Sequence, residues 1–298
     1  MLHRALAQLL APLAVAAWAS ASFAADPAAF KSERISVETR GSGPDVILIP
    51  GLGSSPEVWE GTLKAVEGYR YHLVQVAGFA GASAGANADG PVIAPVAEEI
   101  TRYIEEAELD APALVGHSMG GTLAMTVATR HPDAVSKVMV VDMLPFLGIL
   151  FGPPGTTAET VEPVAAQMRT RLANLAGQER RTAVEAAIAA MVRDESQREQ
   201  PVTHSLDSVP AVSGQAMYDL ITTDLRPELK KLEKPLTVLW VRAPNAPITE
   251  EQMGMIYRMS YANAPQVELK HIPDAYHFIM FDAPERFQSE LRSFLAGK

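Results

Sequence analysis

Short apolar runs alternate with amphipathic stretches along most of this chain. A first segment, residues 34–39, places Ile35 and Val37 between polar neighbours, a period of two that is typical of a half-buried strand. The later runs are apolar at most positions, as expected for strands that are buried on both faces of a parallel sheet. These runs cover residues 46–49, 71–76, 113–115, 138–141, 236–241 and 267–269.

The stretches between these runs have helical periodicity. In the clearest one, apolar residues recur on one side while glutamates occupy the other sides. Its apolar positions are Val92, Val96, Ile100, Tyr103 and Ile104. Strands that alternate with helices predict an α/β fold, with a mostly parallel sheet and helices on both of its faces.

Residues 144–233 interrupt this alternation. The segment contains no convincing strand and is rich in alanine, glutamate, arginine and glutamine. Turn-forming residues divide it at 152–155, Pro201 and Pro210. We therefore predict a helical insertion in the sheet-forming part of the chain.

The N-terminal residues differ in character from the rest. Arg4 precedes an apolar run at residues 5–19, and small residues follow at 20–25. This layout is typical of a secretory signal that is cleaved near Ala24. The alternative is an uncleaved anchor, but a spanning helix needs about 20 strongly apolar residues. We expect a signal peptide at residues 1–24, a periplasmic or secreted mature protein, and no stable membrane anchor after cleavage.

Composition excludes several functions. The formal net charge of the 298 residues is −10 at pH 7, so the chain has no basic footprint for nucleic acid or for anionic membranes. It contains no cysteine, which rules out disulfides, thiolate catalysis and cysteine-bound zinc. An apolar core must then supply the stability, and an apolar content of 48% is normal for a globular protein.

The pentapeptide Gly116-His117-Ser118-Met119-Gly120 carries the strongest chemical signal. It follows an apolar run and precedes a helix-forming one, which is the context of a nucleophile elbow. A serine hydroxyl needs a base to remove its proton, and a sharp turn exposes the hydroxyl to that base. Glycine on both sides removes the collisions that side chains would make there. The alternative is a glycine-rich turn with a capping serine.

Three ordered motifs resemble those of the α/β-hydrolase fold superfamily, in its branch of small capped serine esterases and haloperoxidase-like hydrolases. They are the elbow, the loop 49–55 and the C-terminal segments 276–280 and 284–287. The resemblance implies a mostly parallel, eight-stranded sheet with helices on both faces and a helical cap inserted after strand 6. The hydrolase core would comprise residues 25–143 and 234–298, and the cap would comprise residues 144–233.

The same resemblance assigns roles to the residues of the predicted site. Ser118 is the nucleophile and His277 is the base, with His271 as the second candidate for the base. The backbone amides of Leu52 and Met119 form the oxyanion hole, which stabilises the negative charge that develops on the substrate. The alternative for His277 is a histidine that packs in the core.

The acid of the triad is the one role that the motifs leave open. Many relatives place an aspartate after the seventh strand, but residues 241–249 contain no carboxylate, and Asn245 is the nearest match. Asp142, at the end of the preceding strand, keeps the order serine, acid, histidine. We expect Asp142 to orient His277, with Asn245 as the alternative.

These residues predict a serine hydrolase of carboxylic esters that works through an acyl-enzyme and uses no cofactor and no metal. Haloperoxidase, lactonase and carbon–carbon hydrolase reactions use the same serine and histidine and stay open. Because a carboxylate is missing after the seventh strand, a ligand-binding or low-turnover protein of the same fold is the alternative from another class.

Apolar residues of the insertion indicate what the substrate is like. If the insertion covers the site, they suggest a small hydrophobic, ester-like molecule. They include Met168, Leu172, Ile188, Met191, Met217 and Leu220. For each of them separately, ordinary packing within the insertion is the alternative.

Overall fold

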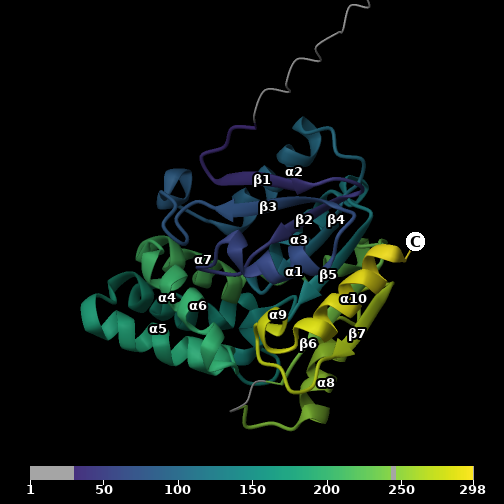
Figure 1. Ribbon diagram of the computed structural model, residues 1–298. Coiled ribbons are helices and arrows are strands. Elements are labelled where there is room, and N and C mark those ends of the chain that lie inside the picture. The colour runs from purple at the N-terminus through teal and green to yellow at the C-terminus, as the bar shows by residue number, and fades with distance from the viewer. Residues whose placement is uncertain (1–29, 243–245, 298) are drawn as a thin grey trace, which may run out of the picture.

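A seven-stranded sheet forms the centre of the molecule (Figure 1). The computed structural model describes residues 30–242 and 246–297. The strands lie in the order β1-β3-β2-β4-β5-β6-β7; β1 runs antiparallel to β3, and the other neighbouring pairs are parallel. Their bounds are β1 Ile35–Gly41, β2 Asp45–Ile49, β3 Arg70–Val76, β4 Ala113–His117, β5 Lys137–Val141, β6 Leu236–Trp240 and β7 Val267–His271.

Each segment that was predicted to be a strand forms a strand in the structure. β2, β4, β5 and β6 are buried at almost every position, which explains their continuous apolar sequences. Seven strands, and not the predicted eight, make up the sheet in the described part of the chain. The eighth was implied by the family resemblance and had no apolar run of its own. Counted along the described residues, the helical insertion therefore follows the fifth strand and not the sixth.

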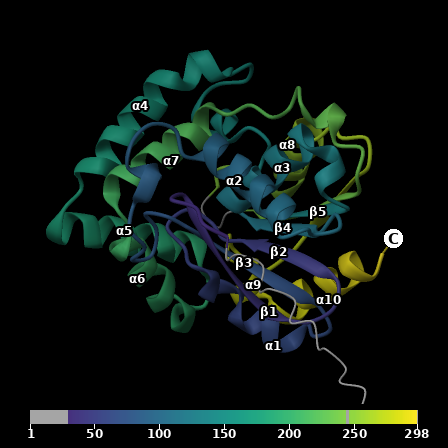
Figure 2. The same cartoon turned by 90° about the horizontal axis from the view of Figure 1, so that it is seen from above.

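Helices cover both faces of the sheet, as Figure 2 shows from above. Successive residues of a strand point to opposite faces, so Ile47 packs in one apolar core and Leu48 in the other, with Trp59 and Phe287. The first face carries α2 Ile93–Glu106, α3 Met119–Arg130 and α8 Glu250–Ser260, and the second carries α1 Glu60–Ala65 and α10 Pro284–Ala296.

Four α-helices follow β5 before the chain returns to β6, and we name them the cap helices. They are α4 Ala158–Asn174, α5 Gly177–Met191, α6 Glu199–Asp207 and α7 Pro210–Thr222, and residues 144–233 contain no strand. The cap helices gather on one side of the sheet (Figure 1). α4 packs against α7, and the small core at this end comprises Phe146, Val161, Ala165 and Ile221.

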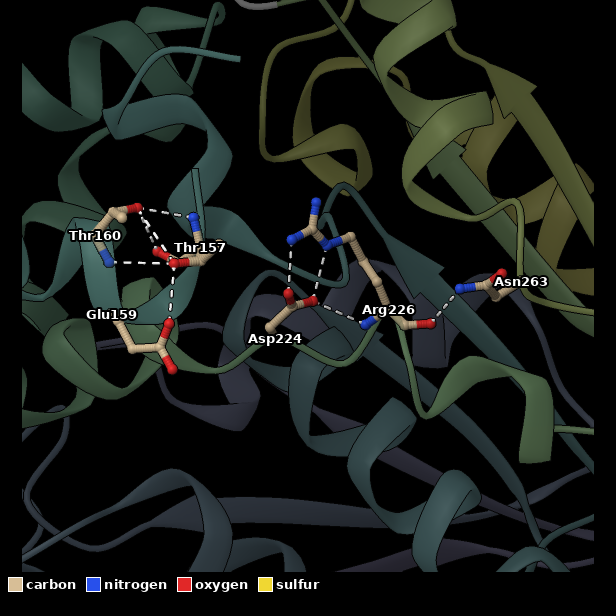
Figure 3. Close-up of polar contacts among 6 residues, drawn as sticks. All are labelled: Thr157, Glu159, Thr160, Asp224, Arg226 and Asn263. Atoms are coloured by element: carbon tan, nitrogen blue, oxygen red, sulfur yellow. Dashed lines mark hydrogen bonds and ion pairs between the residues drawn. The ribbon is translucent and has the colours of Figure 1, made fainter. Parts of the chain in front are cut away.

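Local hydrogen bonds are found where the cap helices begin and in the stretch after they end (Figure 3). Where α4 begins, Thr157 and Thr160 form a capping box, in which each backbone amide donates to the hydroxyl of the other residue, at 2.9 and 3.3 Å. After α7 ends, Arg226 pairs with Asp224 at 2.6 Å, and the Arg226 carbonyl accepts a hydrogen bond from Asn263 at 2.9 Å. The capping box thus defines where α4 begins, and the Asn263 contact ties the stretch after α7 to the segment that follows α8.

Asp219 of α7 ties the cap helices to the core. Its Oδ2 accepts hydrogen bonds from the amides of Val92 and Ile93, at 2.6 and 3.1 Å, where α2 begins. Amides at the start of a helix have no acceptor within that helix, so the carboxylate supplies the missing partner. Gln215 holds the other carboxylate oxygen at 2.7 Å.

Two expectations concern residues that lie outside the described part of the chain. One is the signal peptide at residues 1–24, and the other is the alternative acid, Asn245. Within residues 30–242 and 246–297, no helix is both long enough and apolar enough to cross a membrane.

We expect Asp219→Ala to lower the free energy of unfolding by about 1–3 kcal/mol, because two buried amides lose their acceptor. Asp219→Asn keeps one oxygen acceptor and should lose less. Denaturant titration of the purified variants measures both effects. Native stability of Asp219→Ala would show that this contact does not hold the cap helices to α2.

Candidate active site

Ser118 occupies a sharp turn between β4 and α3. Its backbone has φ 53° and ψ −120°, a conformation that few residues other than glycine adopt. The Ser118 amide donates to the carbonyl of Val141 on β5 at 2.9 Å, and the Ser118 carbonyl accepts from Gly121 at 2.8 Å. The turn is therefore held by the neighbouring strand on one side and by the first turn of α3 on the other, as in a nucleophile elbow.

Two glycines make this turn possible. A Cβ on Gly116 would lie 2.0 Å from the carbonyl oxygen of Gly120, and a Cβ on Gly120 would lie 2.1 Å from that of Ile49. Both distances are far below van der Waals contact, and the obstructing atoms belong to the backbone. These are the collisions that the sequence predicted for the elbow.

Asp142 and His277 form a hydrogen-bonded pair in the site. Nδ1 of His277 donates to Oδ2 of Asp142 at 2.7 Å, so the structure pairs the predicted base with the predicted acid. Asp142 directly follows β5 with φ 52°, a left-handed conformation that aspartate tolerates better than most residues. Its Oδ1 accepts from the amide of Val241 at 3.1 Å and from the hydroxyl of Tyr257 at 2.9 Å. The sequence carried no signal for Tyr257, which belongs to the apolar side of α8.

Ser118, Asp142 and His277 line one cavity of about 460 Å³. Among the described residues, no hydrogen bond joins the Ser118 hydroxyl to His277. Catalytic hydrogen bonds of this kind are often long without substrate and tighten when it binds. His277 is thus held by its hydrogen bond to Asp142, and Ser118 lines the same cavity.

His117, the second residue of the elbow motif, contacts both the backbone and the ring of His277. Its Nε2 lies 3.1 Å from the backbone carbonyl of His277, and because a carbonyl only accepts, Nε2 carries the proton. The His117 ring also packs against the rings of His277 and Phe278, with centroids 4.7 and 4.6 Å away. Burial, and secondly the proximity of His277, lowers the pKa of His117 well below its usual value, so it stays neutral. The sequence analysis assigned this side chain no role.

The loop after β2 lies against the elbow. A Cβ on Gly51 would be 3.2 Å from Cβ of Ser118, and Leu52 lines the cavity. The Leu52 amide donates no hydrogen bond to any described residue, and Met119 opens α3, where an amide has no acceptor in its own helix. The amides of Leu52 and Met119 are therefore both free to donate, as the predicted oxyanion hole requires.

The walls of the cavity are mainly apolar and come largely from the cap helices. Of the six apolar residues singled out in the insertion, five line the cavity, and Met168 instead packs beside the small core between α4 and α7. Arg180 of α5 also lines the cavity and donates to the carbonyls of Ser205 and Ser208, at 2.9 and 2.5 Å, where α6 ends. The cap helices are thus bound to one another around the space that the serine faces.

His204 forms a second cluster with a serine and an acid. Its Nε2 lies 3.2 Å from Ser55 Oγ and 3.0 Å from Glu57 Oε2, while its buried Nδ1 has no partner. In a relay, the acid and the hydroxyl bond to different ring nitrogens, so this cluster does not have the geometry of a triad. It joins the loop after β2 to α6.

His271, the second candidate for the base, is placed elsewhere. It pairs with Glu250 at 3.0 Å and packs on the ring of Trp240 at 4.4 Å. It is not among the described residues that line the cavity. In the described part of the chain, no group of three or more histidine, aspartate or glutamate side chains is arranged to hold a metal ion.

Comparison with known proteins identifies the family. The family described as alpha/beta hydrolase fold matches residues 44–284, and the chain belongs to it. Its relatives include the pimeloyl-[acyl-carrier protein] methyl ester esterase of Aeromonas hydrophila subsp. hydrophila, 30% identical over 70% of this chain and 78% of that protein. The protein of the same name from Nitrosomonas europaea is 28% identical over 86% of this chain and 97% of its own length.

Solved structures show the same fold. An esterase from Exiguobacterium antarcticum superimposes with a TM-score of 0.71 at 21% identity, covering 88% of this chain and 96% of that one. A hydrolase from Pseudomonas aeruginosa superimposes with a TM-score of 0.72 at 17% identity, covering 88% and 94%. At these identities the likeness concerns the fold alone.

Gly120→Ala should destabilise the protein by at least about 3 kcal/mol, because the added methyl group meets the backbone of β2 and cannot be accommodated by side-chain rotation. Gly61→Ala is the matched control, since a Cβ at that exposed position of α1 has nothing within 4 Å. We expect the control to change stability by no more than about 1 kcal/mol. Thermal unfolding compares the two; equal effects would show that the elbow is not tightly packed.

His117 should make the fold sensitive to acid. Its folded pKa is depressed, so its contribution is complete above the unfolded value of about 6.5 and is lost as the pH falls below it. There the unfolded chain binds a proton that the folded chain does not, which costs about 1.4 kcal/mol per pH unit. Denaturant titration measures the free energy of unfolding at neutral pH and at about one pH unit below the unfolded pKa of His117. Between these two pH values, His117→Gln should lose less stability than the native protein. If His117→Gln lost as much stability as the native protein, His117 would not be the cause of the acid sensitivity.

Proposed function

We propose that the protein is a serine hydrolase of carboxylic esters. The observation that carries this proposal is the His277–Asp142 pair, at 2.7 Å, in the same cavity as the serine of a strained elbow. The family includes enzymes whose names describe them as esterases, among them the two methyl ester esterases that this chain resembles. The Asp142–His277 pair also counts against a binding protein, because the sequence-based argument for one rested on a missing carboxylate.

Each residue has a defined part in the reaction. The Ser118 hydroxyl attacks the acyl carbon while Nε2 of His277 takes its proton, and Asp142 stabilises the imidazolium that forms. The amides of Leu52 and Met119 hold the oxyanion. His277 returns the proton to the leaving alcohol, which departs and leaves an acyl-enzyme. Water then attacks this ester with His277 as base, releasing the carboxylic acid and restoring Ser118.

The cavity favours a hydrophobic substrate of modest size. A volume of about 460 Å³ is within the range of sites that enclose small molecules, and its walls are mainly apolar. We infer an ester with an apolar acyl chain and a small alcohol, such as a methyl ester, as the substrate class. Its acyl chain would contact the cap helices, where Leu172, Val184 and Met217 line the cavity.

A fluorophosphonate probe tests the nucleophile, because it phosphonylates only an activated serine. We expect one label per molecule in the native protein by intact mass, none in Ser118→Ala, and a native rate in Ser213→Ala, the matched control from the same cavity. Asp142→Asn should slow labelling and hydrolysis of a short-chain nitrophenyl ester by up to about ten-thousandfold, the loss that the same exchange causes in a serine-protease triad. An unlabelled native protein would exclude the hydrolase and favour a binding function.

A further inference from the structure

Asp142 is held from two sides. Oδ2 faces His277, while Oδ1 faces away from it and accepts hydrogen bonds from the Val241 amide at 3.1 Å and from the Tyr257 hydroxyl at 2.9 Å. The carboxylate therefore bridges His277 and Tyr257, a buried tyrosine that also lines the cavity. Of the two partners of Oδ1, Tyr257 is the one that bonds through its side chain, so a substitution can remove its hydrogen bond.

Tyr257 is itself closely packed. It is 4% exposed, and its ring stacks on those of Trp240 and Tyr261, with centroids 5.3 and 6.3 Å away. Burial, and then the charge of Asp142, raises the pKa of Tyr257 well above its usual value. The hydroxyl thus keeps its proton, and since the Asp142 carboxylate can only accept, the hydroxyl donates to it.

We propose that Tyr257 is a positioning residue of the active site, which holds the Asp142 carboxylate in the orientation that directs His277 toward Ser118. This inference rests on the proposed function. The acid in this chain sits at the end of β5, and the described residues that follow β6 bring no carboxylate to His277. α8, the helix that comes after β6, instead supplies a hydroxyl that fixes the acid of the neighbouring strand.

A purely structural role for Tyr257 is the competing explanation, and the chain contains a matched control for it. Tyr261, one helical turn further on, is also buried and stacks on Tyr257 with an interplanar angle of 6°. Its hydroxyl donates to the carbonyl of Met143 at 2.6 Å and also contacts the sulfur of Met125, but it does not bond to Asp142. Removing either hydroxyl deletes a buried hydrogen bond to an oxygen, but only the Tyr257 hydroxyl bonds to Asp142.

The test compares Tyr257→Phe with Tyr261→Phe in ester hydrolysis and in fluorophosphonate labelling. We expect Tyr257→Phe to lower kcat and the labelling rate at least about tenfold, the loss typical of one hydrogen bond to a charged group, with KM little changed. Tyr261→Phe should keep the native kcat. Thermal unfolding of both variants accompanies the kinetics, so that a general loss of stability is recognised as such.

A double-mutant cycle makes the test independent of stability. If Tyr257 acts through Asp142, Tyr257→Phe should have little further effect on the labelling rate in an Asp142→Asn background. Full additivity of the two substitutions, or equal kinetics for the two phenylalanine variants, would overturn the positioning role while leaving the proposed function intact. Labelling that persists in Ser118→Ala would instead overturn the proposed function and this inference together.

Discussion

The close approach of the elbow to β2 is the constraint on which the active site depends. Backbone meets backbone where Gly120 faces the carbonyl of Ile49, and the loop at Gly51 lies against Ser118. Because backbone atoms make these contacts, side-chain rotation cannot relieve them. β4, α3 and the loop after β2 can therefore pack together in only one arrangement. The serine and the amide of Leu52 therefore share one cavity wall before any substrate arrives.

Sheet topology brings the remaining groups to the same place. β4, β5 and β6 are parallel neighbours, so their carboxyl ends lie along one edge. Ser118 follows β4, Asp142 follows β5, and His277 comes from the segment after β7 at the same edge. This edge is where open α/β sheets bind their ligands. The cap helices then line it with apolar side chains. The Asp142 and His277 side chains are mostly buried, so their contact is stronger than it would be in water.

Much of the fold and part of the site could be predicted because their signals are local. Continuous apolar runs mark the buried strands, and the glycines beside Ser118 mark a turn that no larger residue permits. The described part of the chain has seven strands and not eight, because the eighth was implied by resemblance and not by an apolar run. Met168 was placed near the substrate because helical sequence alone does not show which side of α4 faces α7.

The amino-acid sequence by itself determined the strands, the helical insertion and the serine at the elbow, since each depends on residues close together in the chain. Only the tertiary structure decided which groups serve His277. Asp142 lies 135 residues before it, and Tyr257 lies 115 residues after Asp142. His117 belonged to the motif from the start, but its hydrogen bond to His277 crosses 160 residues. Such contacts follow from strand order and helix packing, which no local pattern encodes.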